Sequence, residues 1–156
     1  MAVAAPTLEY VFTIRVEFDQ RLKFDPTPNG VVRGYTRASG GHITGPRLQG
    51  KVIPYSGGDW PYFRADGAVQ FEAVYLLEAS DGAGIVVKNR GVRHASAETL
   101  AKMNAFQRVE PHEYYFRVAP IFEAPKGPHD WLNRTIIVGG ADRNENYSDF
   151  TYYAVM

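Results

Sequence analysis

The segment YVFTIRVEF, residues 10–18, alternates large apolar side chains with smaller or charged ones. Its apolar positions lie two residues apart, at Tyr10, Phe12, Ile14, Val16 and Phe18. Successive side chains of a β-strand point to opposite faces, so every second position shares one face. The segment therefore predicts a long strand that buries one face and exposes the other.

A second segment with the same period is VQFEAVYLL, residues 69–77. It is followed by Ser80-Asp81-Gly82, and an Asp-Gly pair tolerates the positive φ angles of a tight hairpin turn. The mostly apolar segment at residues 84–89 comes directly after this turn. We therefore predict that residues 69–77 and 84–89 pair as an antiparallel hairpin.

Other parts of the chain show shorter strand patterns and one helical pattern. Ser96 is a favourable helix N-cap, and Leu100, Met103 and Phe106 follow at helical spacing. Thr99, and not Glu or Gln, stands three residues after Ser96, so the capping box is incomplete. Further strands are predicted at residues 43–53, 113–119, 134–138 and 147–155, with a short one near 31–36.

Several long antiparallel strands with one short helix are typical of a mainly β protein. Closing the sheet removes its exposed edges, and a barrel of about eight strands has room for one small ligand. The chain has 156 residues, the length of one domain, and no linker or repeat divides it. We predict a single-domain antiparallel β-barrel over residues 1–156, with a two-sheet sandwich as the alternative.

Composition and charge exclude several classes of protein. The chain has no cysteine, so it forms no disulfide and offers no thiolate nucleophile or zinc-thiolate site. Its 17 basic and 17 acidic residues balance, whereas a nucleic-acid-binding protein carries a basic excess. No apolar run approaches the roughly 20 residues of a membrane span, and the opening MAVAAP lacks the features of a signal peptide. We expect a soluble, cytoplasmic protein whose partner is a small molecule, with neither nucleic acid nor membrane as partner.

The histidines do not predict a metal site. His42, His94, His112 and His129 are widely spaced and form no His-x-His or His-x-x-x-His pair. The glycine runs of the chain also lack the Lys and Ser/Thr of a phosphate-binding loop. We therefore expect no metal and no cofactor. His42 is the histidine that we expect in a ligand pocket, because it follows a Ser-Gly-Gly segment.

The segment Gly57-Gly58-Asp59-Trp60-Pro61 is the strongest local signal of chemistry. The glycine pair permits a tight turn, after which a carboxyl and an indole are presented together. On the rim of a barrel, Asp59 would be a general acid or base and Trp60 a wall on which a ligand stacks. In the alternative interpretation, Asp59 binds turn amides and Trp60 closes the end of the barrel.

The segment YYFR, residues 114–117, places one arginine in an aromatic strand. Arg117 shares a face with Tyr115, opposite Phe116. If that face lines the lumen, Tyr115 contacts a ligand and Arg117 is a fixed cation that binds a carboxylate or an enolate. If the face lies outside, Arg117 is solvated or pairs with Glu123.

Two later segments carry further candidate residues. Glu123 follows the apolar segment at residues 120–122, which would raise its pKa and make it a proton donor, although a structural ion pair explains it equally well. The segment Trp131-Leu132-Asn133 is predicted to form a short turn that packs its indole on the barrel. Asn133 then either orients a ligand or caps the turn.

Nine short segments, in their order and spacing, resemble one protein family. They are GPRLQGKV at residues 45–52, GGDW at 57–60, DG at 66–67, YL at 75–76, DGA at 81–83, NRG at 89–91, YFR at 115–117, PIFE at 120–123 and WLN at 131–133. Residues 139–143 depart from the family pattern as an altered glycine–arginine turn. Together they resemble the domain-of-unknown-function family 3237, from about Gly30 to the end of the chain. This resemblance implies a small β-barrel and no defined activity. It also makes Arg47 a candidate site residue, although the strand pattern groups Arg47 with the water-facing Gln49 and Lys51.

Three functions remain open. The first is a cofactor-independent isomerase, cyclase or lyase that holds a small, largely apolar or aromatic metabolite inside the barrel. In it, Asp59 and Glu123 would move protons while Arg47 or Arg117 steadies an enolate or phenolate. The second is a barrel that binds a small hydrophobic ligand without catalysis, and the third is a homo-oligomeric structural subunit that pairs through its C-terminal aromatic strand. Charged groups that line the cavity would favour the first function over the second.

Overall fold

A computed structural model describes residues 1–156, and all of its strands belong to one antiparallel sheet. The long strands are β1 (Leu8–Lys23), β2 (Val32–Thr44), β6 (Val69–Ala79), β7 (Gly84–His94), β8 (Tyr115–Glu123), β9 (Ile137–Arg143) and β10 (Tyr147–Val155). The short strands are β3 (Gly50–Val52), β4 (Gly58–Asp59) and β5 (Tyr62–Phe63). The helices are α1 (Ala97–Asn104) and the 3-10 helices η1 (Pro111–Glu113) and η2 (Asp130–Asn133).

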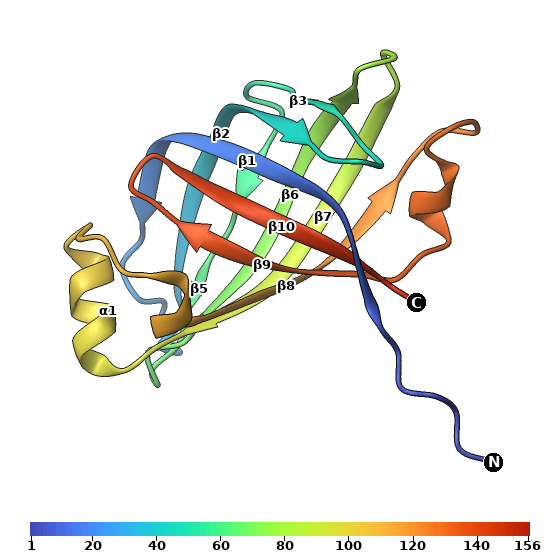
Figure 1. Ribbon diagram of the computed structural model, residues 1–156. Coiled ribbons are helices and arrows are strands. Elements are labelled where there is room, and N and C mark those ends of the chain that lie inside the picture. The colour runs from blue at the N-terminus through green and yellow to red at the C-terminus, as the bar shows by residue number, and fades with distance from the viewer.

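Strand β1 closes the sheet into a barrel (Figure 1). It pairs with β10 on one side and with β2 on the other. From β10 the order continues through β9, β8 and β7 to β6, and β3, β4 and β5 each pair with both β6 and β2. Because the three short strands share one place in the ring, the ten strands form a closed eight-stranded barrel. The predicted barrel is confirmed, and the sandwich alternative is wrong.

The alternation of side chains separates a packed interior from an exposed surface. Strand β8 is buried at every second residue from end to end, and its buried residues include Phe116 and Val118. The largest fully buried side chains are apolar apart from the hydroxyl of Tyr152, and include Phe12, Ile14, Leu77 and Ile85. Tyr10 is exposed, against the prediction, because a β-bulge between Tyr10 and Phe12 shifts the alternation of β1.

Several predicted elements match the structure, and others differ in extent. The hairpin at Gly82 and the helix after Ser96 are confirmed, with the Ser96 hydroxyl accepting a hydrogen bond from the Thr99 amide at 3.2 Å. The predicted strand 43–53 is wrong, because β2 already ends at Thr44 and β3 covers only three residues. Glu113 lies in η1, and β8 and β9 both begin later and run further than predicted.

Two glycines allow the short strand β4 to fit between β2 and β6. A Cβ atom at Gly57 would lie 1.9 Å from the Val74 carbonyl oxygen, and one at Gly58 would lie 2.3 Å from the Thr36 carbonyl oxygen. Glycine has no Cβ, so the backbones can approach this closely. This approach sets the position of Asp59, the next residue of the strand.

The ends of the barrel differ. Helix α1 lies beyond one end, and the N-terminal segment extends away from the opposite end (Figure 1). None of the helices is long and apolar enough to cross a membrane.

The close approach at Gly57 gives a stability prediction. Replacing Gly57 with alanine is expected to lower the free energy of unfolding by about 1–3 kcal/mol, because the new methyl group forces β4 and β6 apart. Urea denaturation measures this change. Gly84→Ala is the control, because a Cβ atom at Gly84 meets nothing within 4 Å. Equal stabilities for the two variants would contradict the packing described for β4.

Candidate functional site

The barrel encloses a cavity of about 120 Å³ near the end covered by α1. Its walls include five phenylalanine side chains: Phe18, Phe63, Phe71, Phe116 and Phe150. Its polar lining residues include Asp59 from β4, Tyr75 from β6, and Asn89 and Arg93 from β7. The cavity is therefore an apolar, ring-lined space with a small number of polar groups, a combination typical of small-molecule sites.

Each of these four residues presents an enclosed atom that has no protein hydrogen-bond partner. These atoms are Asp59 Oδ1, the Tyr75 hydroxyl, Asn89 Oδ1 and Arg93 Nε. Buried polar atoms are paired in the great majority of cases, so four unpaired atoms around one cavity are unusual. They provide donors and an acceptor for a molecule bound in the cavity.

Asp59 is the acidic residue of the cavity. The residue is only partly buried as a whole, but its Oδ1 atom is enclosed. Burial raises the pKa of Asp59 from 3.8 to about 7, and the backbone of Glu72 and the charge of Arg93 oppose this increase only in part. Near neutral pH the carboxyl is therefore divided between its protonated and ionised forms.

Arg93 is the cation of the cavity. Its relative exposure is 7%, and its guanidinium lies 5.4 Å from the centre of the Phe71 ring and 5.8 Å from that of Phe116. Burial lowers the pKa of Arg93 to about 9, and the nearby Arg143 adds to this decrease. Arg93 is still charged at neutral pH.

Asn89 and Tyr152 form a buried polar pair beside the cavity. Asn89 Nδ2 donates a 3.0 Å hydrogen bond to the Tyr152 hydroxyl, and both residues are buried. Burial raises the pKa of Tyr75 above its ordinary value, so its hydroxyl is protonated at neutral pH. Tyr75 can therefore donate a hydrogen bond into the cavity, while Asn89 Oδ1 can accept one.

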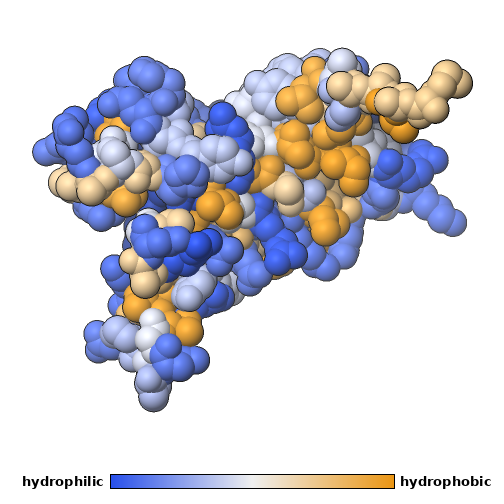
Figure 2. Space-filling model, turned by 90° about the horizontal axis from the view of Figure 1, so that it is seen from below, coloured by the Kyte–Doolittle hydropathy of each residue, from blue (hydrophilic) through white to orange (hydrophobic).

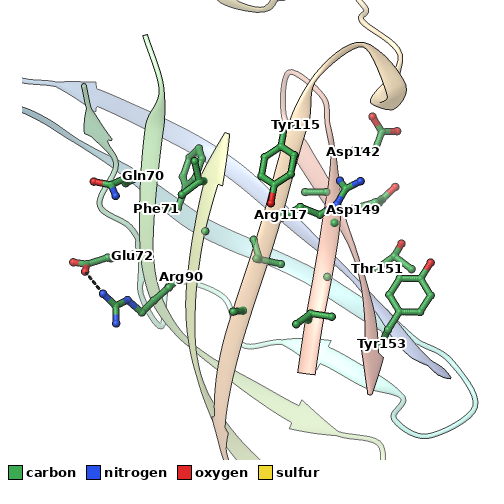
Figure 3. Close-up of a pocket in the computed structure, with 18 of the residues that line it drawn as sticks. Gln70, Phe71, Glu72, Arg90, Tyr115, Arg117, Asp142, Asp149, Thr151 and Tyr153 are labelled. Carbon is green, nitrogen blue, oxygen red and sulfur yellow. Dashed lines mark ion pairs between the residues drawn. The ribbon is translucent and has the colours of Figure 1, made fainter. Parts of the chain in front are cut away.

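A larger hollow lies outside the barrel, over the outer faces of β6 to β10. This outer groove has a volume of about 1250 Å³. Figure 3 shows Gln70, Glu72 and Arg90 on one side of it and Arg117 on a neighbouring strand. From below, the molecule shows exposed hydrophobic side chains bordered by hydrophilic ones (Figure 2).

The charged groups of the outer groove are ordinary surface groups. Arg90 pairs with Glu72 at 3.7 Å, and both side chains are more than half exposed. Asp149, also in the groove, is bound by Arg15 through two hydrogen bonds. The enclosed and unpaired groups of the lumen are better suited to chemistry, since water does not screen them.

Arg117 and Tyr115 lie in the outer groove and not in the lumen. Tyr115 is 46% exposed, and the Arg117 guanidinium lies 5.4 Å from its ring centre and donates to the Phe116 carbonyl at 3.0 Å. The inward side chains of β8 are those of the opposite parity, such as Phe116. The condition under which Arg117 was expected to act on a ligand in the lumen is therefore not met.

Glu123 and Arg47 are also outside the barrel. Glu123 is exposed, and Lys88 Nζ donates a 2.8 Å hydrogen bond to its carboxylate. This contact agrees with the expected ion pair and not with the expected apolar setting. The Arg47 guanidinium lies 3.7 Å from the centre of the Trp131 ring. Asp59 therefore does not meet any of the other three expected catalytic residues.

The remaining candidates occupy structural positions. Trp131 packs edge-on against Phe12, and Asn133 exchanges two hydrogen bonds of 2.9 and 3.0 Å with the backbone of Ala124. Trp60 is 41% exposed and packs on Tyr35, with 5.1 Å between the ring centres. His42 is exposed on β2 and not in a pocket.

Sequence reasoning missed Asn89 and Arg93, and the chain carried a signal for both. On β7 they share a face with the apolar Ile85 and Val87. Polar residues at the apolar positions of an alternating strand face the interior, where their burial is costly without a purpose. The predicted strand ended at residue 89, so Arg93 was never placed on that face.

Comparisons with known proteins agree with this architecture. The family model described as "Protein of unknown function (DUF3237)" matches residues 6–156. A UPF0311 protein of Rhodopseudomonas palustris is 35% identical over 141 residues, which is 89% of this chain and 91% of that protein. The crystal structure of a beta-barrel like protein from Acinetobacter baumannii superimposes with a TM-score of 0.86 at 29% identity, covering 99% of each chain.

A more distant relative carries the name of an enzyme. The hydroalkoxylation enzyme phnH of Penicillium herquei is 28% identical over 149 residues, which is 95% of this chain and 82% of that protein. The closed barrel, the ring-lined lumen and the match over nearly the whole chain lead to one assignment. This chain belongs to the DUF3237 family.

Proposed function

We propose that this protein is a cofactor-independent enzyme that transfers a proton to and from a small, largely apolar or aromatic molecule held in the lumen. The observation that carries the proposal is the enclosed and unpaired Oδ1 atom of Asp59, in a cavity that five phenylalanine side chains also line. Burial raises the pKa of this carboxyl to about 7. A group with a pKa near the working pH can both donate and accept a proton. Raising the pKa of a carboxyl by burial is a common way to make it a general acid.

The relationship to phnH supports one reaction class, an intramolecular cyclisation. Hydroalkoxylation adds an O–H group across a carbon–carbon double bond, and within one molecule this is an isomerisation. Asp59 would donate its proton to one alkene carbon, and the substrate's hydroxyl oxygen would form the new C–O bond at the other. The hydroxyl proton then returns to the Asp59 carboxylate. Where the substrate enters as a phenolate, water supplies that proton instead, so atoms and charges balance without an oxidant or a reductant.

The cavity walls support the same chemistry. An engineered apolar cavity of about 150 Å³ binds benzene, so a space of 120 Å³ suits one aromatic ring with its substituent towards the opening. The rings of Phe71 and Phe116 are stacked with their centres 4.9 Å apart and form an apolar wall on which an aromatic substrate can pack. Rigid walls also hold a flexible substituent in the conformation that closes a ring.

The alternative function is a non-catalytic barrel that binds a small hydrophobic ligand. A purely apolar lumen with all charges outside would support that function. Asp59 and Arg93 instead line the cavity. The enzyme is therefore the better supported of the two.

Replacing Asp59 with asparagine tests the proposed proton transfer. With ortho-methallylphenol and related hydroxyaryl alkenes as substrates, Asp59→Asn is expected to lower kcat/KM by about 100-fold or more, because the amide cannot donate the proton. Product formation is followed by chromatography. Glu123→Gln is the matched control, because this exposed carboxyl pairs with Lys88 outside the barrel and its loss should leave turnover unchanged.

Two results would contradict the proposal. One is undiminished turnover by a folded Asp59→Asn protein. The other is a wild-type protein that binds these phenols in the lumen but converts none of them, which would favour the ligand-binding barrel.

The raised pKa of Asp59 also predicts how stability depends on pH. The unfolded carboxyl ionises near 3.8 and the folded one near 7, so between these values the folded state holds one more proton. The free energy of unfolding of the wild type should therefore fall, relative to Asp59→Asn, as the pH rises from about 4 to about 7. At about 1.4 kcal/mol per pKa unit, the difference is at most about 4 kcal/mol.

Urea denaturation of both proteins across this pH range measures the effect. Subtracting the two curves removes the contributions of carboxyls with lowered pKa values, such as Asp19, Asp66 and Asp81. A difference in the free energy of unfolding that stays constant with pH would mean that Asp59 has the same pKa in the folded and unfolded states.

A further inference from the structure

The lumen and its mouth carry more positive than negative charge. Arg93 lines the cavity, and Arg21 and Arg143 line it nearer the opening, whereas Asp59 is the one acidic residue among the lining side chains. None of the three arginines forms an ion pair in the structure. Arginines on the outer surface do so, as Arg15 does with Asp149 at 2.7 Å and Arg108 with Asp142 at 2.8 Å.

Arg93 is the innermost of these cations. It is nine-tenths buried, its Nε atom has no hydrogen-bond partner, and its guanidinium lies near the stacked rings of Phe71 and Phe116. A guanidinium is a planar fork of N–H donors that matches the oxygens of a carboxylate or a phenolate. The unpaired donor of Arg93 is thus placed beside aromatic walls.

The other two arginines, Arg21 and Arg143, lie at the opening of the cavity. The Arg143 side chain donates from Nη1 to the Met103 carbonyl at 2.9 Å, and the guanidinium groups of Arg143 and Arg21 lie 5.1 and 5.3 Å from the centre of the Phe106 ring. Phe106 follows α1, so the helix end helps to position both cations. Glu145 is the acidic residue whose charge acts on Arg21, and it is exposed to solvent.

Three neighbouring cations repel one another until an anion lies among them. The positive charges of Arg143 and Arg21 both act on Arg93, and Arg21 also acts on Arg143. A neutral ligand would leave this repulsion in place and would keep the Arg93 donor unpaired. An anion would relieve both, and its attraction to the mouth would speed its entry.

We propose that the lumen selects a single-ring aromatic anion, with the ring among the phenylalanine side chains and its oxyanion on the guanidinium of Arg93. This inference deepens the proposed function, on which it rests for placing the substrate in the lumen, and it adds the charge of the substrate. It assigns Arg93 as the residue that distinguishes charged from neutral ligands. Arg21 and Arg143 attract the anion towards the opening.

A binding experiment with benzoate and benzamide tests the proposal, because the two have nearly the same shape and differ in charge. Titration calorimetry at neutral pH should show benzoate binding at least about tenfold more tightly, a difference of about 1.4 kcal/mol. Added salt should weaken the binding of benzoate and leave the binding of benzamide unchanged. Para-nitrophenol extends the test to phenolates, because its absorbance shifts if the ionised form is bound.

Variants of Arg93 test whether this residue causes the preference for benzoate over benzamide. Arg93→Met should remove the preference for benzoate, and Arg93→Lys should keep part of it because the charge remains. Arg117→Met is the matched control, since Arg117 lies in the outer groove, and it should bind both ligands as the wild type does. If Arg93→Met does not fold, Arg93→Lys and Arg143→Met provide the comparison, and each should show a smaller preference than the wild type.

Equal binding of benzoate and benzamide by the wild type, or binding of neither, would overturn the proposal. So would a folded Arg93→Met protein that keeps the full preference for benzoate. These outcomes do not depend on turnover. A protein that prefers benzoate but cyclises no alkene would refute the proposed reaction alone, whereas a protein that cyclises alkenes with no charge preference would refute this inference alone.

Discussion

The pairing of β1 with both β10 and β2 is the constraint on which the rest of the structure depends. It closes the sheet, so each strand has one face that water reaches and one face that it does not. A polar side chain on the inner face can therefore form hydrogen bonds only with groups inside the barrel, and where none is in reach it stays unpaired. Asp59, Tyr75, Asn89 and Arg93 each present an unpaired atom there because the closed sheet separates them from solvent.

The enclosed carboxyl of Asp59 and the enclosed guanidinium of Arg93 form no ion pair with each other, so burying them lowers the stability of the folded protein. Apolar residues of similar volume would pack the same space without the cost of burying charge. Unpaired polar groups and shifted pKa values occur preferentially at functional sites, where a ligand supplies the missing partners. The aromatic walls and the charges act together in this interpretation. The rings exclude water, and the low polarity that results is what raises the pKa of Asp59.

Much of the fold could be predicted from the sequence, because alternation in β1 and β6 reports burial directly. The hairpin at Asp81-Gly82, the Ser96 cap and the place of Asp59 after two glycines are local features that tertiary packing did not change. The faces were harder to assign. Parity grouped Arg117 with Tyr115 correctly, but parity alone does not say which group faces inwards, and the apolar Phe116 and Val118 decide it. The polar residues that share the cavity with Asp59 come from β6 and β7, and the pairing of β4 with β6 and of β6 with β7, which no local pattern around Asp59 reports, brings them together.

This chain is similar over most of its length both to relatives named only by family and to a protein named as an enzyme. The proposed proton transfer requires a carboxyl in the barrel whose proton is available at neutral pH. The most direct test is a titration of the Asp59 side-chain carboxyl by carbon-13 NMR, with Asp59→Asn identifying the signal. A midpoint near pH 7 is the result that the structure predicts. A midpoint near pH 4, the value of an ordinary exposed aspartate, would contradict it.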